Sequence, residues 1–286
     1  MNLFRKDPLQ IITFDAYGTN THFYLRGRAL EDESIDLDNK SWLNLLINEE
    51  GWINFEVSYA DQDKNRVIQN GNRFPGKLLI PSDKADFGII TDIDDTILHT
   101  GVVSTLKWKV LFNTVFKTAK NRLPLKGASD LYKLLHRGKS GENANPIFYV
   151  SHSPWNLYRY LELFLRQNNF PKGPILLRTF QSFFKRKTAE DKPQKQLEIV
   201  NILKTYPKLP FILIGDSGEH DADIYKEIAE LYPNRILAIY LRSVNHRKRM
   251  IRVRGLFDNY KTTPVLFVEN SEQAVIHAKK MGFISN

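Results

Sequence analysis

The chain has 286 residues, of which 42% are hydrophobic and 26% charged, so general disorder is excluded and one large domain, or a main domain with a smaller companion, is expected. Basic residues exceed acidic ones by nine, which favours an anionic partner: nucleic acid, an acidic membrane surface or a phosphorylated substrate. The absence of cysteine excludes disulfides and thiolate metal sites.

Sequence signals for export and for membrane spanning are weak. No stretch approaches the roughly 18 consecutive apolar residues that would span a bilayer. The segment after Met1 contains Arg5, Lys6 and Asp7 in place of the apolar core of a secretory signal. We therefore expect a cytoplasmic protein, with any membrane contact peripheral.

The first 85 residues predict a small β-rich accessory domain. Asp38–Ile47 could form a short helix, because its apolar residues recur on one face. Pro81–Lys84 has the composition of a linker, so we place the domains at residues 1–85 and 86–286. Short apolar or aromatic runs predict strands at Ile11–Tyr17, His22–Leu30, Trp52–Tyr59 and Lys77–Ile80.

From residue 86 onward, short apolar runs alternate with amphipathic segments, which predicts an α/β fold with a doubly wound parallel sheet. One helix is expected to begin with Ser153 as cap and Pro154 at its first position. The expected strands are Phe87–Ile93, Ile147–Val150, Ile175–Leu177, Phe211–Ile214, Ile236–Tyr240 and Val265–Val268, and the other expected helices are Gln194–Lys204, Asp221–Leu231 and Ser271–Lys280, the last with a glycine stop at Gly282.

Acidic turns follow two of these strands, at the edge of the sheet where ligands bind in open α/β folds. Asp92 and Asp94 end the first strand, and Asp216 and Asp221 follow the fourth. Carboxylates that converge in one crevice repel one another unless a cation neutralises them, and oxygen ligands point to Mg²⁺. The competing interpretation is that such acids cap helices, for which Asp221 is well placed.

The order of these motifs resembles that of haloacid-dehalogenase-type phosphatases. Asp92–Thr96 is similar to the first motif, Ser151 to the second, Lys195 to the third and Gly215–Asp221 to the fourth. The resemblance implies a Rossmann-like, haloacid-dehalogenase-type sheet and a Mg²⁺-dependent phosphatase.

A narrower resemblance, over roughly Phe87 to Arg254, is to the actin-patch-protein type of phosphatidate phosphatase catalytic domain. Val150–Leu157, Asn169–Arg178 and Phe211–Asp221 carry it. It implies hydrolysis of phosphatidate to diacylglycerol and phosphate. His152 stands where a small or amide residue is expected.

The resemblance also implies a role for each site residue. Asp92 would attack phosphorus and form an aspartyl-phosphate, while Asp94, protonated at first, would act as general acid and then as base. Ser151 and Lys195 would hold phosphoryl oxygens; Lys187 and Lys192 lie near Lys195 and are weaker candidates. Mg²⁺ would be bound by the Asp92 carboxylate, the Asp94 backbone carbonyl and Asp216, and Asp221 would be a further ligand or would orient metal-bound water. Secondary or open roles fall to Asp95, Thr96, Arg178 and His220.

Two basic segments are candidates for contact with an anionic partner. Leu106–Phe116, flanked by lysines, is either an apolar lid that meets lipid or a helix packed on the sheet. Arg242–Arg254 could rest against anionic lipid, bind nucleic acid non-specifically or be a solvated surface. No nucleic-acid motif accompanies it, so specific nucleic-acid binding is not favoured.

We therefore expect a Mg²⁺-dependent phosphatidate phosphatase. A phosphatase of a soluble phosphomonoester is the nearest alternative, and a catalytically idle peripheral membrane adaptor is the other. The acidic cluster argues against the idle adaptor, because an inactive protein has no need of it.

Overall fold

The computed structural model describes residues 9–31, 51–57, 74–94, 96–97, 125–142, 144–178, 192–218, 220–244 and 246–285. The chain divides into two units, Met1–Ser82 and Asp83–Asn286. The expected helix Asp38–Ile47, the insertion Leu106–Phe116 and Asp95 lie outside the described residues. No described helix is both long and apolar enough to cross a bilayer.

The N-terminal unit is built from two small sheets. One pairs β1 (Leu9–Thr13) antiparallel with β4 (Gly27–Glu31), and the other has the order β3–β2–β6–β5. The strands of the second sheet are β2 (Ala16–Gly18), β3 (Phe23–Tyr24), β5 (Trp52–Val57) and β6 (Phe74–Leu79). The β-rich character is confirmed, but the runs Ile11–Tyr17 and His22–Leu30 each contain two strands. The first strand of the first run (β1) pairs with the last strand of the second run (β4), whereas β2 and β3 pair in the other sheet. Apolar composition alone does not predict where one strand ends and the next begins.

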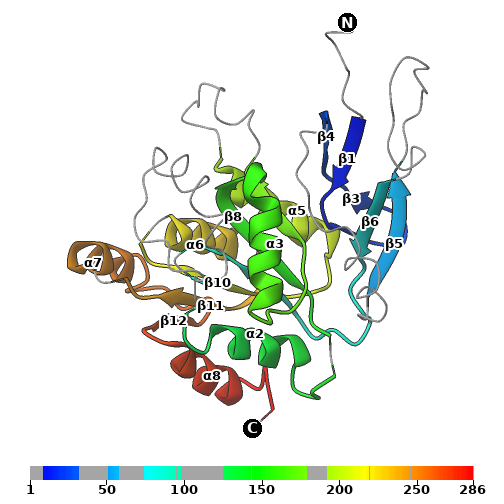
Figure 1. The fold of residues 1–286 in the computed structure, drawn as a ribbon. Helices are drawn as coiled ribbons and strands as arrows, with labels where there is room; N and C mark the ends of the chain where they lie inside the picture. The colour runs from blue at the N-terminus through cyan, green and yellow to red at the C-terminus, as the bar shows by residue number, and fades with distance from the viewer. Residues whose placement is uncertain are drawn as a thin grey trace, which may run out of the picture. The chain divides into compact units, whose positions relative to one another are not determined.

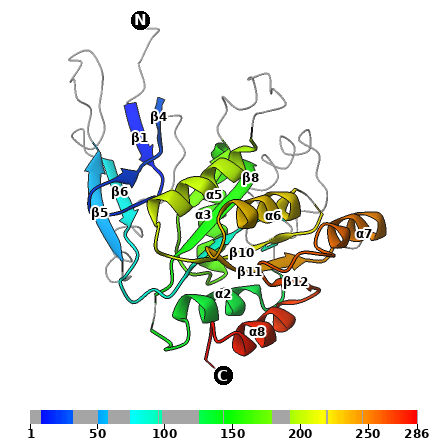
Figure 2. The ribbon, with the colours of Figure 1, turned by 180° about the vertical axis from the view of Figure 1, so that it is seen from behind.

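The second unit contains a six-stranded sheet in the order β12–β11–β10–β7–β8–β9, with every neighbouring pair parallel (Figures 1 and 2). The predicted doubly wound α/β class is confirmed. The chain builds outward from β7 to β9 and then from β10 to β12, so the winding reverses between β7 and β10, where open α/β sheets bind ligands. The strands are β7 (Gly88–Thr91), β8 (Ile147–Pro154), β9 (Ile175–Arg178), β10 (Phe211–Asp216), β11 (Ile236–Arg242) and β12 (Val265–Val268).

Helices cover both faces of this sheet (Figures 1 and 2). α2 (Ala128–Arg137) packs beside α8 (Ser271–Lys280) on one face, and α5 (Gln194–Thr205) packs beside α6 (Asp221–Leu231) on the other. β7 and β10 are buried along their whole length, as expected for central parallel strands. Gly88 allows this packing, because a Cβ there would lie 2.3 Å from the ring of Phe211.

The predicted helices α5, α6 and α8 are confirmed, and α8 ends at Lys280, two residues before the expected glycine stop at Gly282, whose φ is +72°. Two helices were not expected. α2 was not predicted, although its apolar residues recur at helical spacing and four of them are buried: Ala128, Leu131, Tyr132 and Leu135. α7 (Arg247–Gly255) lies in the basic segment and buries only Val253, so it has no apolar stripe from which to predict it.

The helix expected to start at Ser153 begins later. β8 continues to Pro154, which pairs with Arg178 of β9. A short 3₁₀ turn, η3 (Trp155–Leu157), follows and leads into α3 (Tyr158–Gln167). Pro154 is the cap position of that turn, and no side chain caps it. The predicted serine cap is therefore wrong, because the Ser153 hydroxyl is engaged elsewhere.

Candidate active site

The site lies where β7 and β10 end side by side. Asp92 follows β7 directly, and its backbone N–H donates to Ile214 O of β10 at 2.9 Å. Asp216 is the last residue of β10. The two acidic residues are each 1% exposed. Adjacent parallel strands thus bring together carboxylates that are far apart in the sequence.

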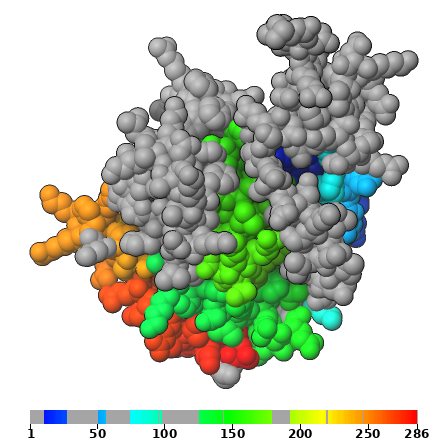
Figure 3. All heavy atoms as spheres, viewed as in Figure 1, coloured from blue at the N-terminus to red at the C-terminus, as the bar shows by residue number. Residues whose placement is uncertain are grey.

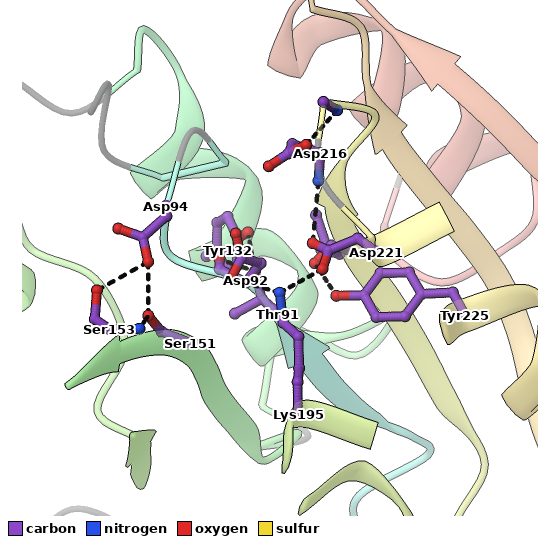
Figure 4. Close-up of polar contacts among 12 residues, drawn as sticks. Thr91, Asp92, Asp94, Tyr132, Ser151, Ser153, Lys195, Asp216, Asp221 and Tyr225 are labelled. Carbon is purple, nitrogen blue, oxygen red and sulfur yellow. Dashed lines mark hydrogen bonds and ion pairs between the residues drawn. The ribbon is translucent and has the colours of Figure 1, made fainter. Parts of the chain in front are cut away.

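Lys195 stands between two of the carboxylates (Figure 4). It is in the first turn of α5, its side chain is fully buried, and its Nζ donates to Asp92 Oδ1 at 2.7 Å and to Asp221 Oδ1. Burial alone would lower the pKa of Lys195, but the two carboxylates outweigh it and raise that pKa. The side chain is therefore a fixed ammonium ion at the centre of the site.

Contacts in the loop between β10 and α6 orient Asp216 and Asp221. Asp216 Oδ1 accepts a hydrogen bond from the Gly218 N–H, and Asp221 Oδ2 accepts one from the Asp216 N–H at 3.3 Å. Asp221 is the first residue of α6 and is fully buried, while the cap position is His220, without a side-chain cap. The capping interpretation of Asp221 is therefore wrong: its carboxylate faces Lys195.

The environment of Asp92 disfavours a negative charge. Burial raises the pKa of Asp92 well above its usual range, and the Lys195 ammonium opposes this shift. Three neighbouring carboxylates raise it further: Asp221, Asp94 and Asp216. Additional positive charge beside Asp92 would favour its ionised form.

The donor set fits a magnesium ion. Asp92, Asp216 and Asp221 each offer a carboxylate oxygen within 4.8 Å of the others, and all three are buried. Asp92 Oδ2 accepts no hydrogen bond from any described residue. Three carboxylates against one ammonium leave two negative charges when all are ionised, which one dication would neutralise.

Asp94 lies on the other side of Asp92 and is held by two serines (Figure 4). Its Oδ2 accepts hydrogen bonds from Ser151 Oγ at 2.7 Å and from Ser153 Oγ at 3.0 Å. Ser151 Oγ also accepts one from the Ser153 N–H at 2.8 Å. Ser151 is thus near the site as expected, but its hydroxyl contacts Asp94. Ser153 was missed as a site residue because the Ser-Pro pair resembled a helix start.

Two buried tyrosines support the strand ends, and neither was predicted as a site residue. Tyr132 of α2 shares a 2.5 Å hydrogen bond with Thr91 Oγ1, and Thr91 Oγ1 donates to the Asp92 carbonyl at 2.8 Å. Tyr225 of α6 donates to Ile214 O at 3.0 Å. These contacts fix the backbone on which Asp92 and Asp216 stand.

His152 lies between the two serines at the end of β8. Its pKa falls to about 4, first because of burial and then because of the Lys195 ammonium. The Nε2 atom is buried and has no hydrogen-bond partner among the described residues. A neutral imidazole therefore borders the site.

The secondary candidates occupy different positions. Lys192 is exposed and pairs with Glu227, so it is outside the buried cluster. Thr96 is buried, Arg178 is half-buried and His220 is exposed. Lys187 and Asp95 are outside the described residues.

Comparison with known proteins places the site inside a family match. The sequence model described as "Phosphatidate phosphatase APP1, catalytic domain" matches residues 87–243. Phosphatidate phosphatase APP1 of Saccharomyces cerevisiae is 39% identical over 170 residues, which are 59% of this chain and 27% of that protein. An uncharacterized protein of Schizosaccharomyces pombe is 31% identical over 163 residues, 57% of this chain and 26% of that protein. The matches thus span about a quarter of each relative's length.

Proposed function

The chain belongs to the family of phosphatidate phosphatase APP1 catalytic domains, and we propose that it hydrolyses phosphatidate to diacylglycerol and inorganic phosphate. One observation carries the proposal beyond family membership. Four buried charged groups converge at the point where the winding of the sheet reverses: Asp92, Lys195, Asp216 and Asp221. Burying so many charges is costly, and a phosphoryl-transfer site gives them a use.

Asp92 is the proposed nucleophile, in the manner of haloacid-dehalogenase-type phosphatases. Its carboxylate attacks phosphorus in line, the bond from phosphorus to the diacylglycerol oxygen breaks, and an aspartyl-phosphate forms. Water then attacks that phosphorus, which releases phosphate and restores Asp92. The 2.7 Å contact with Lys195 holds the carboxylate in one orientation.

Asp94 is the proposed general acid and base. In its protonated form it gives a proton to the leaving diacylglycerol oxygen, and it later takes one from the attacking water. Ser151 and Ser153 fix its carboxyl group from one side. Two short hydroxyl contacts on one oxygen restrict rotation of the side chain, so the other oxygen keeps a set position.

Lys195 and Ser151 are the proposed ligands of the phosphoryl oxygens; the Ser151 hydroxyl would turn from Asp94 to the substrate, while Ser153 keeps its contact with Asp94. The buried ammonium gains most as negative charge spreads over those oxygens in the transition state. Mg²⁺ would be held by the carboxylates of Asp92, Asp216 and Asp221 and by the Asp94 backbone carbonyl, and when bound it would neutralise charge on the phosphoryl group. The fit of the donor set, with Asp92 Oδ2 accepting no hydrogen bond from a described residue, supports this assignment.

The test is phosphate release from mixed micelles of phosphatidate, measured with Mg²⁺ and with a chelator, for the wild type and Asp92→Asn. The proposal predicts Mg²⁺-dependent release that the substitution abolishes. A panel of water-soluble phosphomonoesters separates the nearest alternative: release from these esters alone would show a soluble-substrate phosphatase. Failure on every substrate, with the fold intact, would favour the idle adaptor.

A further inference from the structure

The helix α7 presents an exposed basic face that the phosphatase chemistry does not use. Arg247–Gly255 reads RKRMIRVRG and contains no acidic residue. Val253 is fully buried and anchors the inner side. The outer side carries Arg247, Lys248 and Arg254 as exposed residues, and in Figure 3 the helix, in orange, projects from the left of the molecule.

An apolar side chain lies among these cations. Ile251 is 63% exposed, and at 100° per residue it falls on the same side of α7 as Arg247, Lys248 and Arg254. α7 has no apolar stripe, so its attraction to a bilayer would come mainly from cations that meet negative headgroups, with this one isoleucine as an apolar contact. Nucleic acid would use the cations but gives an exposed isoleucine no role.

Two of the cations of α7 make contacts with other parts of the same chain. Arg252 forms a bidentate pair with Asp223 of α6, with both contacts at 2.9 Å. Arg249 Nη1 donates to the Gly218 carbonyl at 2.8 Å. No described carboxylate lies within ion-pair distance of Arg247 or Lys248. These two cations are therefore available to an external anion.

The same contacts connect α7 to the candidate site. Gly218 lies in the loop between β10 and α6, and its N–H donates to Asp216 Oδ1. Arg249 binds the carbonyl of that same glycine. A surface that holds α7 thus also holds the loop that positions Asp216.

We propose that α7, through Arg247, Lys248, Ile251 and Arg254, docks the chain on an anionic lipid bilayer. The occupant is the bilayer surface, whose negative headgroups complement Arg247 and Lys248, while Arg254 lies over the ring of Phe267 at the edge of this face. The inference rests on the proposed function, because docking beside the site matters most when the substrate is a membrane lipid. It adds to that function the element that contacts the membrane.

The test is sedimentation of the full chain with vesicles of phosphatidylcholine, alone or with phosphatidylserine, and without phosphatidate. We expect salt-sensitive binding to the anionic vesicles only. Arg247→Glu with Lys248→Glu should weaken this binding at least tenfold, since each cation near such a surface contributes about a factor of five. Ile251→Asn should weaken it severalfold, because the apolar contact is lost.

The matched control is Lys279→Glu with Lys280→Glu on α8, which makes the same charge change at two exposed residues. This control should bind within about threefold of the wild type. Equal weakening by the control, or no binding by the wild type, would overturn the proposal. Binding of duplex DNA that displaces vesicles and is indifferent to Ile251→Asn would also overturn it and identify a nucleic-acid face.

Hydrolysis separates this inference from the proposed function. The α7 double variant should lose activity on vesicles that contain phosphatidate but keep its rate on a monodisperse short-chain phosphatidate. If the wild type hydrolyses neither form, the proposed function fails, while sedimentation still decides the role of α7. Equal loss on both forms would show that the variant damages the site and that α7 is not a docking face.

Discussion

Lys195 donates a 2.7 Å hydrogen bond to Asp92 across 103 residues of sequence, with both side chains buried. The pair joins the first turn of α5 to the end of β7. Because Lys195 also contacts Asp221, a single ammonium links the end of β7 to the first residue of α6. Removing it would leave two buried carboxylates facing each other.

Lys195→Met should therefore lower kcat/KM for phosphatidate by at least about 100-fold, as the loss of a preorganised charge in an active site typically does. It should also destabilise the fold, because it leaves buried charges without their partner. Lys192→Met is the control, since Lys192 is exposed and forms only a surface pair with Glu227. Steady-state kinetics and thermal unfolding measure both effects. Equal kinetic losses in the two variants would contradict the role of Lys195.

Ser153→Ala should lower kcat about tenfold, because it removes one of the two hydroxyl contacts that hold Asp94. Ser129→Ala is the control: its hydroxyl bonds the Asn169 carbonyl at 3.1 Å, away from the acids. KM should change little, since Ser153 acts through Asp94. A kcat equal to that of the wild type would show that Ser151 alone suffices to position the acid.

Gly215→Ala should impair both folding and activity. A Cβ at this position would lie 2.4 Å from Asp221 Oδ2 and 2.8 Å from the ring of Tyr225, so Asp221 would have to move. Overpacking of this kind costs about 1–3 kcal/mol. Gly255→Ala is the control, because the nearest atom to its added Cβ is 3.9 Å away. The melting temperature and the rate of phosphate release should both fall for Gly215→Ala and not for Gly255→Ala. A Gly215→Ala variant that releases phosphate at the wild-type rate would contradict the placement of Asp221.

His152 should make the fold less stable in mild acid. Its pKa is about 4 in the folded chain, against an ordinary value of 6.5, so between these values the unfolded chain binds a proton that the folded chain does not. Stability is then full above pH 6.5 and is lost as the pH falls. Relative to His152→Gln, the wild type should lose about 2 kcal/mol of unfolding free energy between pH 7 and pH 5. Urea unfolding at both values measures this difference, and a constant difference would show that His152 titrates normally.

Much of the second unit was predictable, because its central strands are short apolar runs that each end in a polar turn. β7 and β10 carry Asp92 and Asp216 at their ends, and the parallel class alone places those residues at one edge. The parallel class of the sheet does not predict that Lys195 is buried while Lys192, three residues earlier, is exposed. Which face of α5 meets the sheet depends on packing across the whole unit.

The errors have local causes. Ser153-Pro154 has the composition of a helix start, yet Pro154 pairs with Arg178 and the strand continues. Tertiary pairing overrides the local preference, and the freed hydroxyl becomes a site contact. α7 was not predicted because most of its residues are Arg or Lys. No apolar periodicity therefore marks the segment as a helix.

Asp92 is the residue that we expect to form the bond to phosphorus. The most direct test is a single-turnover experiment with radiolabelled phosphatidate and Mg²⁺, quenched in acid, on the wild type, Asp92→Asn and Asp92→Ala. We expect phosphate bound to the wild-type protein and released by hydroxylamine, with neither bound nor free phosphate formed by the two variants. Phosphate release by both variants at a rate within about tenfold of the wild type would contradict it.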